Sequence, residues 1–174
     1  TLRLLTAGGY VPHKRQHIIP ETAAALQGAG LDFRWDVVGP PGRVPGYFDG
    51  IAREVESRGL VGRVMLHGAV PVDRLAGLYD VAHLYVQPSI EEGFCLTALD
   101  AAAAGLPVIA SRAGALPEIV QASGGRLVKS APGPLAEAIA GFLREKAWPR
   151  PGHCLRRSAR AFLGNGRRRP WRRA

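Results

Sequence analysis

The stretch from Gln87 to Ser111 contains the residues whose types and spacing are best suited to chemistry. It reads QPSIEEGFCLTALDAAAAGLPVIAS, with two acids, Glu92 and Asp100, on either side of a turn at Gly93. We expect an apolar strand before the turn and an Ala-rich helix shortly after it, so the first amide N–H groups of that helix have no partner within the helix. The stretch therefore predicts an anion-binding site at a helix N-terminus.

The spacing of the two acids argues against a shared proton. Asp100 follows Glu92 by eight residues, and a rise of 1.5 Å per helical residue puts them up to ~12 Å apart. Glycoside hydrolases place their paired carboxyl groups about 5 to 9.5 Å apart. We therefore expect the two acids to contact different parts of an elongated ligand, such as a sugar and a ribose. The alternative, that Glu91 and Glu92 are loop surface charges and Asp100 a polar residue of a helix face, is equally compatible with the spacing.

A second candidate loop runs from Thr6 to Arg15, after the first expected strand. The adjacent Gly8 and Gly9 let the backbone approach a ligand, and Lys14 with Arg15 supplies positive charge for an anion such as a diphosphate. The loop has neither the GxGxxG nor the Walker pattern. A tight turn with solvated basic residues explains it equally well, so the loop predicts phosphate binding only in combination with the stretch around Glu92.

The positions of these loops follow from the alternation of short apolar runs with segments of helical period. This alternation predicts an α/β fold, a Rossmann-like, doubly wound parallel sheet of about six strands with helices on both faces. In such a sheet ligands bind outside the carboxyl ends of the strands, where both candidate loops lie. The expected strands are Leu2–Thr6, Phe33–Val38, Val64–His67, His83–Gln87, Pro107–Ala110 and Arg126–Val128, and the expected helices are Gln16–Gln27, Tyr47–Arg58, Val72–Tyr79, Cys95–Ala104, Ala115–Ala122 and Gly133–Arg144.

The charge of the chain is concentrated at its C-terminal end. The 174 residues carry a net charge of +9, and the segment after Arg144 holds ten Lys and Arg against one acid, so the remainder is neutral. We therefore expect one Rossmann-like domain in residues 1–148 and an Arg/Pro/Gly-rich tail, disordered or atypical, in residues 149–174. No nucleic-acid surface is indicated on the domain itself.

Composition excludes several other classes of protein. No apolar run reaches the length of a membrane span, because Asp100, Arg112 and Glu118 interrupt the most hydrophobic stretch. Two cysteines, Cys95 and Cys154, are too few and too scattered for a disulfide framework or a zinc site, which favours a reducing, cytoplasmic compartment. The chain begins directly with an expected strand, so it has the look of a piece of a longer protein.

The stretch around Glu92 resembles the most diagnostic segment of the retaining, group 1 (family four) glycosyltransferases of the GT-B fold. Their pattern of two glutamates separated by seven residues is written here as Glu92-GFCLTAL-Asp100, followed by AAAAGLPVIAS. Further similar segments are GALPEIV at 114–120, Val38-Gly39 and His67-Gly68. The resemblance covers about residues 2–145 and implies the C-terminal, donor-binding domain of such an enzyme, with the N-terminal, acceptor-binding domain missing.

The resemblance implies roles for individual residues. Glu92, the catalytic candidate, would face the donor sugar near its reacting carbon. Asp100 stands where the family usually has a glutamate that binds the ribose hydroxyls. Lys14 matches the diphosphate-binding lysine, whereas Gly9 replaces the usual arginine, a loss of charge that Arg15 would make good. The rest of the implied donor site consists of Gly8, Gly93, Phe94, Cys95, Leu96, Thr97 and Glu118.

Within this group, backbone amides of residues 94–97 would face the diphosphate and the sugar hydroxyls. Cys95 replaces a more usual glycine and is expected to be a packed residue rather than a nucleophile. Glu118 would lie near the crevice, although an acid stabilising a helix N-terminus explains it nearly as well. The resemblance implies a nucleoside-diphosphate sugar as donor, no cofactor and no metal, and permits work at the inner face of a membrane.

Two functions of other classes stay open at this stage. A non-catalytic nucleotide-binding or interaction module would share the fold without the chemistry. Nucleic-acid binding through the basic tail is the other. An NAD-dependent oxidoreductase is disfavoured, because Gly39-Pro40-Pro41-Gly42 follows the second expected strand, where such enzymes have an acid.

Overall fold

Strands and helices alternate throughout residues 1–144, the part of the chain that this computed structural model describes. The expected tail at 149–174 lies outside these residues. The strands are β1 (Leu2–Ala7), β2 (Phe33–Val38), β3 (Val64–His67), β4 (Leu84–Gln87), β5 (Val108–Ala110) and β6 (Arg126–Leu127). The α-helices are α1 (Ile19–Gly28), α2 (Tyr47–Ser57), α3 (Val72–Val81), α4 (Leu96–Ala103), α5 (Leu116–Ser123) and α6 (Pro132–Arg144).

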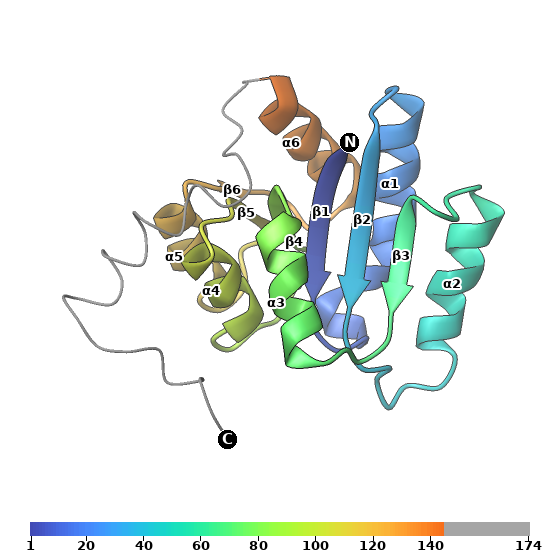
Figure 1. Cartoon of the computed structure of the whole chain (residues 1–174), viewed down its shortest axis with the longest axis horizontal. Helices are drawn as coiled ribbons and strands as arrows, with labels where there is room; N and C mark the ends of the chain where they lie inside the picture. The colour runs from blue at the N-terminus through green and yellow to red at the C-terminus, as the bar shows by residue number, and fades with distance from the viewer. Residues whose placement is uncertain (145–174) are drawn as a thin grey trace.

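The strands form one parallel sheet in the order β3-β2-β1-β4-β5-β6 (Figure 1). The predicted α/β, Rossmann-like fold is therefore confirmed. The chain builds outward from β1 through β2 to β3, then crosses back to β4 and continues in the opposite direction. The switch point between β1 and β4 is where such sheets bind their ligands, and the loops after β1 and β4 are the two candidate loops.

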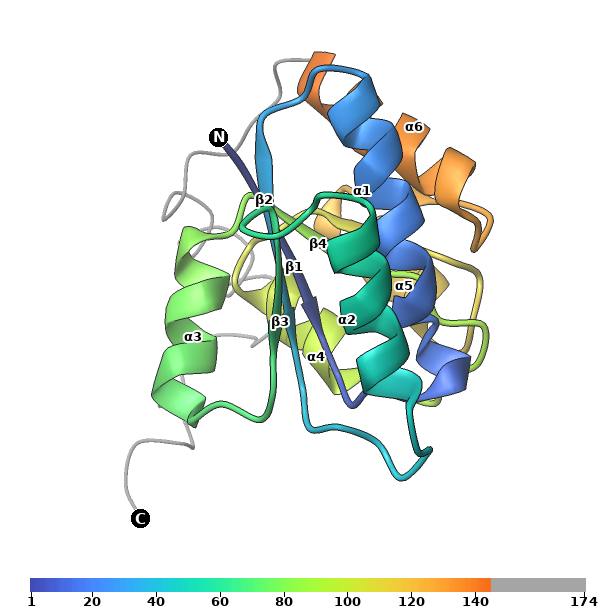
Figure 2. The same cartoon turned by 90° about the vertical axis from the view of Figure 1, so that its right-hand side faces the viewer.

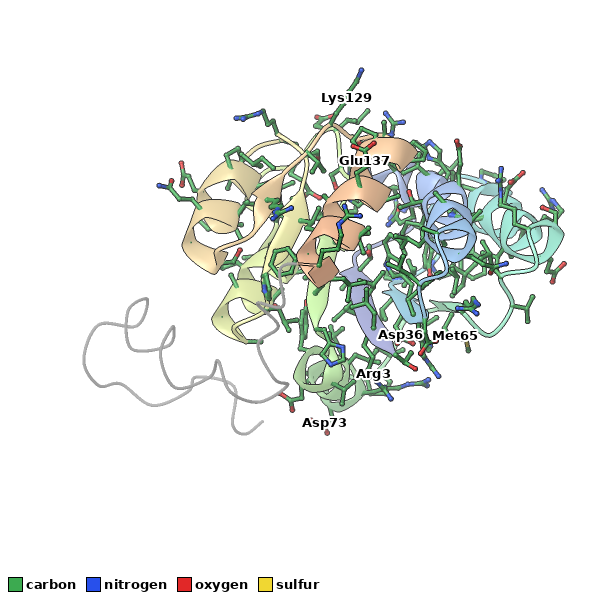
Figure 3. All side chains as sticks on the ribbon, turned by 90° about the horizontal axis from the view of Figure 1, so that it is seen from above. Arg3, Asp36, Met65, Asp73, Lys129 and Glu137 are labelled. Carbon is green, nitrogen blue, oxygen red and sulfur yellow. The ribbon has the colours of Figure 1, made fainter. Side chains whose placement is uncertain are left out.

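Apolar side chains on both faces of the sheet hold the helices in two layers. Leu4 and Trp35 point into a core shared with α1, α2 and α6, whereas Leu5 and Tyr85 point into a second core under α3, α4 and α5. All four side chains are at most 1% exposed. Figure 2 shows α1 and α2 on one side of the sheet and α3 on the other, and Figure 3 shows the same separation between Asp73 of α3 and Glu137 of α6. Strands covered on both faces read as continuous apolar runs, which is why they were recognisable in the sequence.

The first helix departs from its predicted bounds. Residues Gln16–Ile18 form a 3₁₀ turn, and the α-helix begins at Ile19 instead of Gln16. Pro20 lacks the N–H group that would donate to the carbonyl of Gln16, so one α-helical hydrogen bond in the first turn of the predicted helix cannot form. The other elements agree with their predicted bounds to within two residues, the usual uncertainty of helix and strand ends. Within residues 1–144 no helix is both long and apolar enough to cross a membrane.

Candidate functional site

Three loops are tied together at the carboxyl ends of the strands. The amide of Ile90, in the loop after β4, donates to the carbonyl of His13, in the loop after β1, at 2.8 Å. The amide of Ala115, after β5, donates to the carbonyl of Gly93 at 3.1 Å. The structure thus brings the two loops that were candidates in the sequence face to face at the switch point.

Lys14 and Glu92 form an ion pair at the centre of this junction. Lys14 Nζ lies 2.6 Å from Glu92 Oε1, and the two side chains are only 19% and 7% exposed. The stem of Lys14 passes over Gly8, where an added Cβ would lie 3.1 Å from Lys14 Cδ. Gly8 therefore leaves the room through which the lysine reaches the acid, while an added Cβ on Gly9 would meet only Pro40, no nearer than 3.8 Å.

Two further donors act on the same carboxylate oxygen. Ser89 Oγ donates to Glu92 Oε1 at 2.7 Å, and Gln87 Nε2 donates to it at 3.1 Å. Burial would raise the pKa of the Glu92 carboxyl, but the hydrogen bond and charge of Lys14, together with hydrogen bonds from the side chains of Ser89 and Cys95, outweigh burial and hold this pKa below its ordinary value. Glu92 is therefore a carboxylate at neutral pH, suited to stabilising positive charge rather than to donating a proton.

The N-terminus of α4 adjoins this pair. No side chain caps the helix, and Cys95 at its N-cap adopts a left-handed conformation with φ of 46°. The thiol of Cys95 is buried, and burial together with the charge of Glu92 raises its pKa, so it is not a reactive thiolate. Thr97 Oγ donates to the carbonyl of Ala7 at 2.9 Å, which ties α4 to the end of β1.

The neighbouring apolar residues of this loop face solvent. Phe94 is 69% exposed and Leu96 is 66% exposed. Neither side chain packs into a core, so a ligand can contact both their backbone and their apolar side chains. Within residues 1–144 no group of three or more His, Cys, Asp or Glu side chains is arranged to hold a metal ion, and the absence of a metal from the reaction stays a prediction.

The two remaining predicted acids lie at the rim. Asp100, on α4, is exposed, and partial burial of its carboxyl raises its pKa. Glu118, in the first turn of α5, is also exposed. Among residues 1–144, the carboxylate of neither acid forms a hydrogen bond or an ion pair, in contrast to that of Glu92.

Among the described residues, Lys14 and not Arg15 forms the ion pair with Glu92. Arg15 adopts a left-handed conformation, with φ of 55°, between the 3₁₀ turns Pro12–Lys14 and Gln16–Ile18. Its charge adds to burial in lowering the pKa of His17. The cation that acts on the Glu92 carboxyl is Lys14 instead. The prediction that Arg15 replaces the charge missing at Gly9 stays untested.

Three buried polar residues of this site, Tyr85, Gln87 and Ser89, are not among the predicted site residues. Tyr85 OH lies 2.9 Å from Gln87 Oε1, and Gln87 Nε2 lies 2.7 Å from Ser89 Oγ. The available signal was a glutamine at the end of the otherwise apolar strand LYVQ, because a buried amide must find hydrogen-bond partners.

Comparisons with known proteins show the family of the chain. The family model described as "Glycosyl transferases group 1" matches residues 1–145. The D-inositol 3-phosphate glycosyltransferase of Mycolicibacterium paratuberculosis is 34% identical over 142 residues, which make up 80% of this chain and 32% of that protein. The chain thus spans about a third of the length of this relative.

Solved structures share the fold. Sucrose-phosphate synthase from Thermosynechococcus elongatus superposes with a TM-score of 0.72 at 28% identity, covering 92% of this chain and 40% of that one. Alr3699/HepE from Anabaena, solved in complex with UDP, has a TM-score of 0.72 at 20% identity, covering 92% of this chain and 43% of that one. The family match over most of the chain, the relative and the Rossmann-like half of a GT-B fold lead to one conclusion. The chain belongs to the group 1 family of glycosyl transferases.

Proposed function

We propose that this chain binds the nucleoside-diphosphate sugar of a glycosyltransferase whose complete form transfers the sugar, with retention of configuration, to an acceptor hydroxyl. The observation that carries the proposal is the largely buried Lys14–Glu92 pair at the switch point, beside the N-terminus of α4. A cation and a helix N-terminus suit a diphosphate, and an ionised acid suits a sugar that develops positive charge. UDP in the complex of the Anabaena protein, which has the same fold, is a ligand of the proposed chemical class.

The proposed donor lies across the crevice from α4 to the β1 loop. Lys14 carries three N–H donors, and its bond to Glu92 leaves two for phosphate oxygens. The uncapped amides at the start of α4 would bind the same diphosphate. Asp100, on the exposed side of α4, would accept hydrogen bonds from the ribose hydroxyls.

In the proposed reaction the bond between the anomeric carbon and the diphosphate oxygen breaks first. The Glu92 carboxylate stabilises the positive charge that develops on the sugar, an effect that is strong where water is excluded. Lys14 and the α4 amides stabilise the negative charge on the departing diphosphate. The acceptor oxygen then bonds to the anomeric carbon on the face that the diphosphate leaves, and its proton passes to the departing phosphate oxygen.

The binding half of the proposal can be tested on this chain. Calorimetric titration with UDP, GDP, ADP and their sugars should reveal a preference for one nucleotide, with affinity reduced about tenfold or more in Lys14→Ala, as expected for loss of a charged hydrogen bond. Arg58→Ala is the matched control, because it removes a cation whose partner is Glu54 on the surface of α2. Equal affinities of Lys14→Ala and the parent chain would contradict the proposal.

The catalytic half requires a protein that contains this chain together with an acceptor-binding domain. There, Glu92→Gln should reduce the transfer rate by about 10²- to 10³-fold, the usual effect of removing one charge-stabilising group, while nucleotide affinity changes little. The anomeric configuration of the product, determined by NMR, tests retention. Transfer unaffected by Glu92→Gln, with nucleotide binding still dependent on Lys14, would instead favour a non-catalytic nucleotide-binding module.

A further inference from the structure

A chain of buried polar groups runs behind Glu92, away from the crevice. Tyr85, Gln87 and Ser89 are at most 1% exposed, and they link Glu92 to the core side of β4. Their contacts are Tyr85 OH to Gln87 Oε1 at 2.9 Å, Gln87 Nε2 to Ser89 Oγ at 2.7 Å, and both Gln87 and Ser89 to Glu92 Oε1. Buried polar groups are costly unless all are paired, so this arrangement constrains every proton in it.

The single proton of Tyr85 OH has one satisfactory position. Its three neighbours at 2.9 Å are Ala7 O, Thr97 Oγ and Gln87 Oε1. Ala7 O already accepts from the Thr97 hydroxyl, whereas Tyr85 OH is the donor that the described residues offer to Gln87 Oε1. Placing the proton toward Gln87 therefore leaves no buried acceptor without a donor.

This proton fixes the orientation of the Gln87 amide. With Oε1 turned to Tyr85, the two N–H groups of Nε2 point to Ser89 Oγ and to Glu92 Oε1. The flipped amide would bring its oxygen to within about the same distance of the carboxylate, an arrangement of two acceptors that repel each other. The hydrogen bond from Tyr85 thus orients the Gln87 amide so that its NH₂ group, and not its oxygen, faces Glu92.

We propose that Gln87 and Tyr85 are positioning residues, which hold Oε1 of Glu92 toward Lys14 and leave the other carboxylate oxygen to the donor sugar. This inference rests on the proposed function for the sugar, but the positioning itself is a property of the chain alone. Lys14, Ser89 and Gln87 all converge on Oε1, so the carboxylate cannot rotate without losing three hydrogen bonds. A carboxylate held in this way needs no reorganisation when charge develops beside it.

The same hydroxyl couples the carboxylate to the phosphate-binding loops. Tyr85 OH accepts from the amide of Ala7 at 3.3 Å and lies 2.9 Å from Oγ of Thr97, in the first turn of α4. The end of β1, the start of α4 and the Glu92 carboxylate therefore share one buried hydroxyl. A shift of either phosphate-binding segment would change the orientation of Glu92.

NMR titration of the Glu92 carboxyl in the 174-residue chain tests the inference without any ligand. Gln87→Met keeps the length of the side chain but removes its donors. It should raise the pKa of Glu92, with an acid dissociation constant about tenfold lower, as expected for loss of a hydrogen bond to a charged group. Tyr85→Phe should lower this constant about threefold, by releasing the orientation of the Gln87 amide. In the Gln87→Met background, Tyr85→Phe should have no further effect, because Tyr85 acts through Gln87.

Tyr10→Phe is the matched control. Tyr10 is fully buried at the same edge of the sheet and its hydroxyl contacts Val37 O and His67 O, with no link to Glu92. It should leave the Glu92 titration unchanged. An unchanged titration in Tyr85→Phe, or equal effects of Tyr85→Phe in both backgrounds, would overturn the inference.

The complete enzyme separates the two proposals. If both hold, Tyr85→Phe reduces kcat while KM for the donor stays within about twofold, as expected when ground-state binding is preserved. Shifted Glu92 titrations in a chain that binds no nucleotide would uphold the positioning and reject the proposed function. Nucleotide binding lost in Lys14→Ala, with Glu92 titrations unaffected by Tyr85→Phe, would do the reverse.

Discussion

Glu92 and Asp100 lie eight residues apart in sequence but in opposite environments. Glu92 is 7% exposed and accepts hydrogen bonds from Lys14, Ser89 and Gln87, so its pKa is lowered in spite of burial. Asp100 is exposed on α4, and partial burial without a compensating donor raises its pKa. The protein therefore completes the hydrogen bonds of one acid itself and leaves those of the other to a ligand.

This difference matches the two tasks that we assign to the acids. A group that stabilises a developing charge is most effective when it is fixed beforehand, because no ordering is needed during the reaction. A group that recognises a ribose gains most when its hydrogen-bonding capacity is unused in the free protein. Under the proposed function, hydrogen bonds within the chain would hold the acid at the sugar end of the site, and the acid at the nucleoside end would be free to bind the ligand.

The largest effect is expected from displacing the backbone of Glu92, which would remove the difference between the two acids. A Cβ added to Gly114 would lie 2.0 Å from the carbonyl oxygen of Glu92, and its φ is +48°. We expect Gly114→Ala to reduce the free energy of unfolding by about 3 kcal/mol, through left-handed strain and a backbone clash together. Urea denaturation of the chain measures this loss.

Gly124 provides a control for the strain alone. Its φ is +68°, but an added Cβ would meet nothing within 4 Å. Gly124→Ala should therefore cost only about 1 kcal/mol. Equal losses of unfolding free energy in the two variants would mean that the loop of Glu92 adjusts to the added Cβ at little cost. Glu92 would then not be held in a fixed position.

Removal of Lys14 is expected to have the next largest effect. Lys14→Ala leaves Glu92 buried with two neutral donors, so we expect a loss of about 2 kcal/mol in the free energy of unfolding at pH 7. The control is again Arg58→Ala, whose ion pair with Glu54 is 37% and 54% exposed and should contribute less than about 0.5 kcal/mol. A loss no greater than that of Arg58→Ala would show that the Lys14–Glu92 pair behaves as a surface contact.

The contribution of the Lys14–Glu92 pair to stability should depend on pH. Because the folded-state pKa of Glu92 is lowered, its interactions contribute fully above the pKa of the unfolded chain and are lost as pH falls through the lowered value. The stability difference between the parent chain and Lys14→Ala should therefore shrink between pH 7 and pH 3, as measured by urea denaturation across this range. A difference independent of pH would assign the effect of Lys14 to packing of its stem over Gly8 rather than to charge.

The parts of this arrangement differ in how far the sequence predicts them. The bounds of β2 and β3 agree with prediction because apolar residues predominate in both strands and turn residues flank them, although Arg34 and Asp36 interrupt the run in β2. The proximity of the Lys14 and Glu92 loops follows from parallel-sheet topology. The orientation of the Gln87 amide does not follow from the sequence, because it depends on where the hydroxyl proton of Tyr85 points and on the exact positions of the neighbouring atoms.

The smallest effect on stability is expected at Asp100. Its raised pKa means that folding disfavours the ionised form, so Asp100→Asn should leave the free energy of unfolding at pH 7 within about 0.5 kcal/mol of the parent or slightly above it, and any gain should vanish as the pH falls and Asp100 becomes neutral. Nucleotide affinity should nevertheless fall about fivefold, because the ribose loses a charged acceptor. Asp100→Glu, which restores the longer acid usual in the family, should raise it. A variant that loses stability but no affinity would make Asp100 a structural residue, and the two acids would then differ in exposure but not in task.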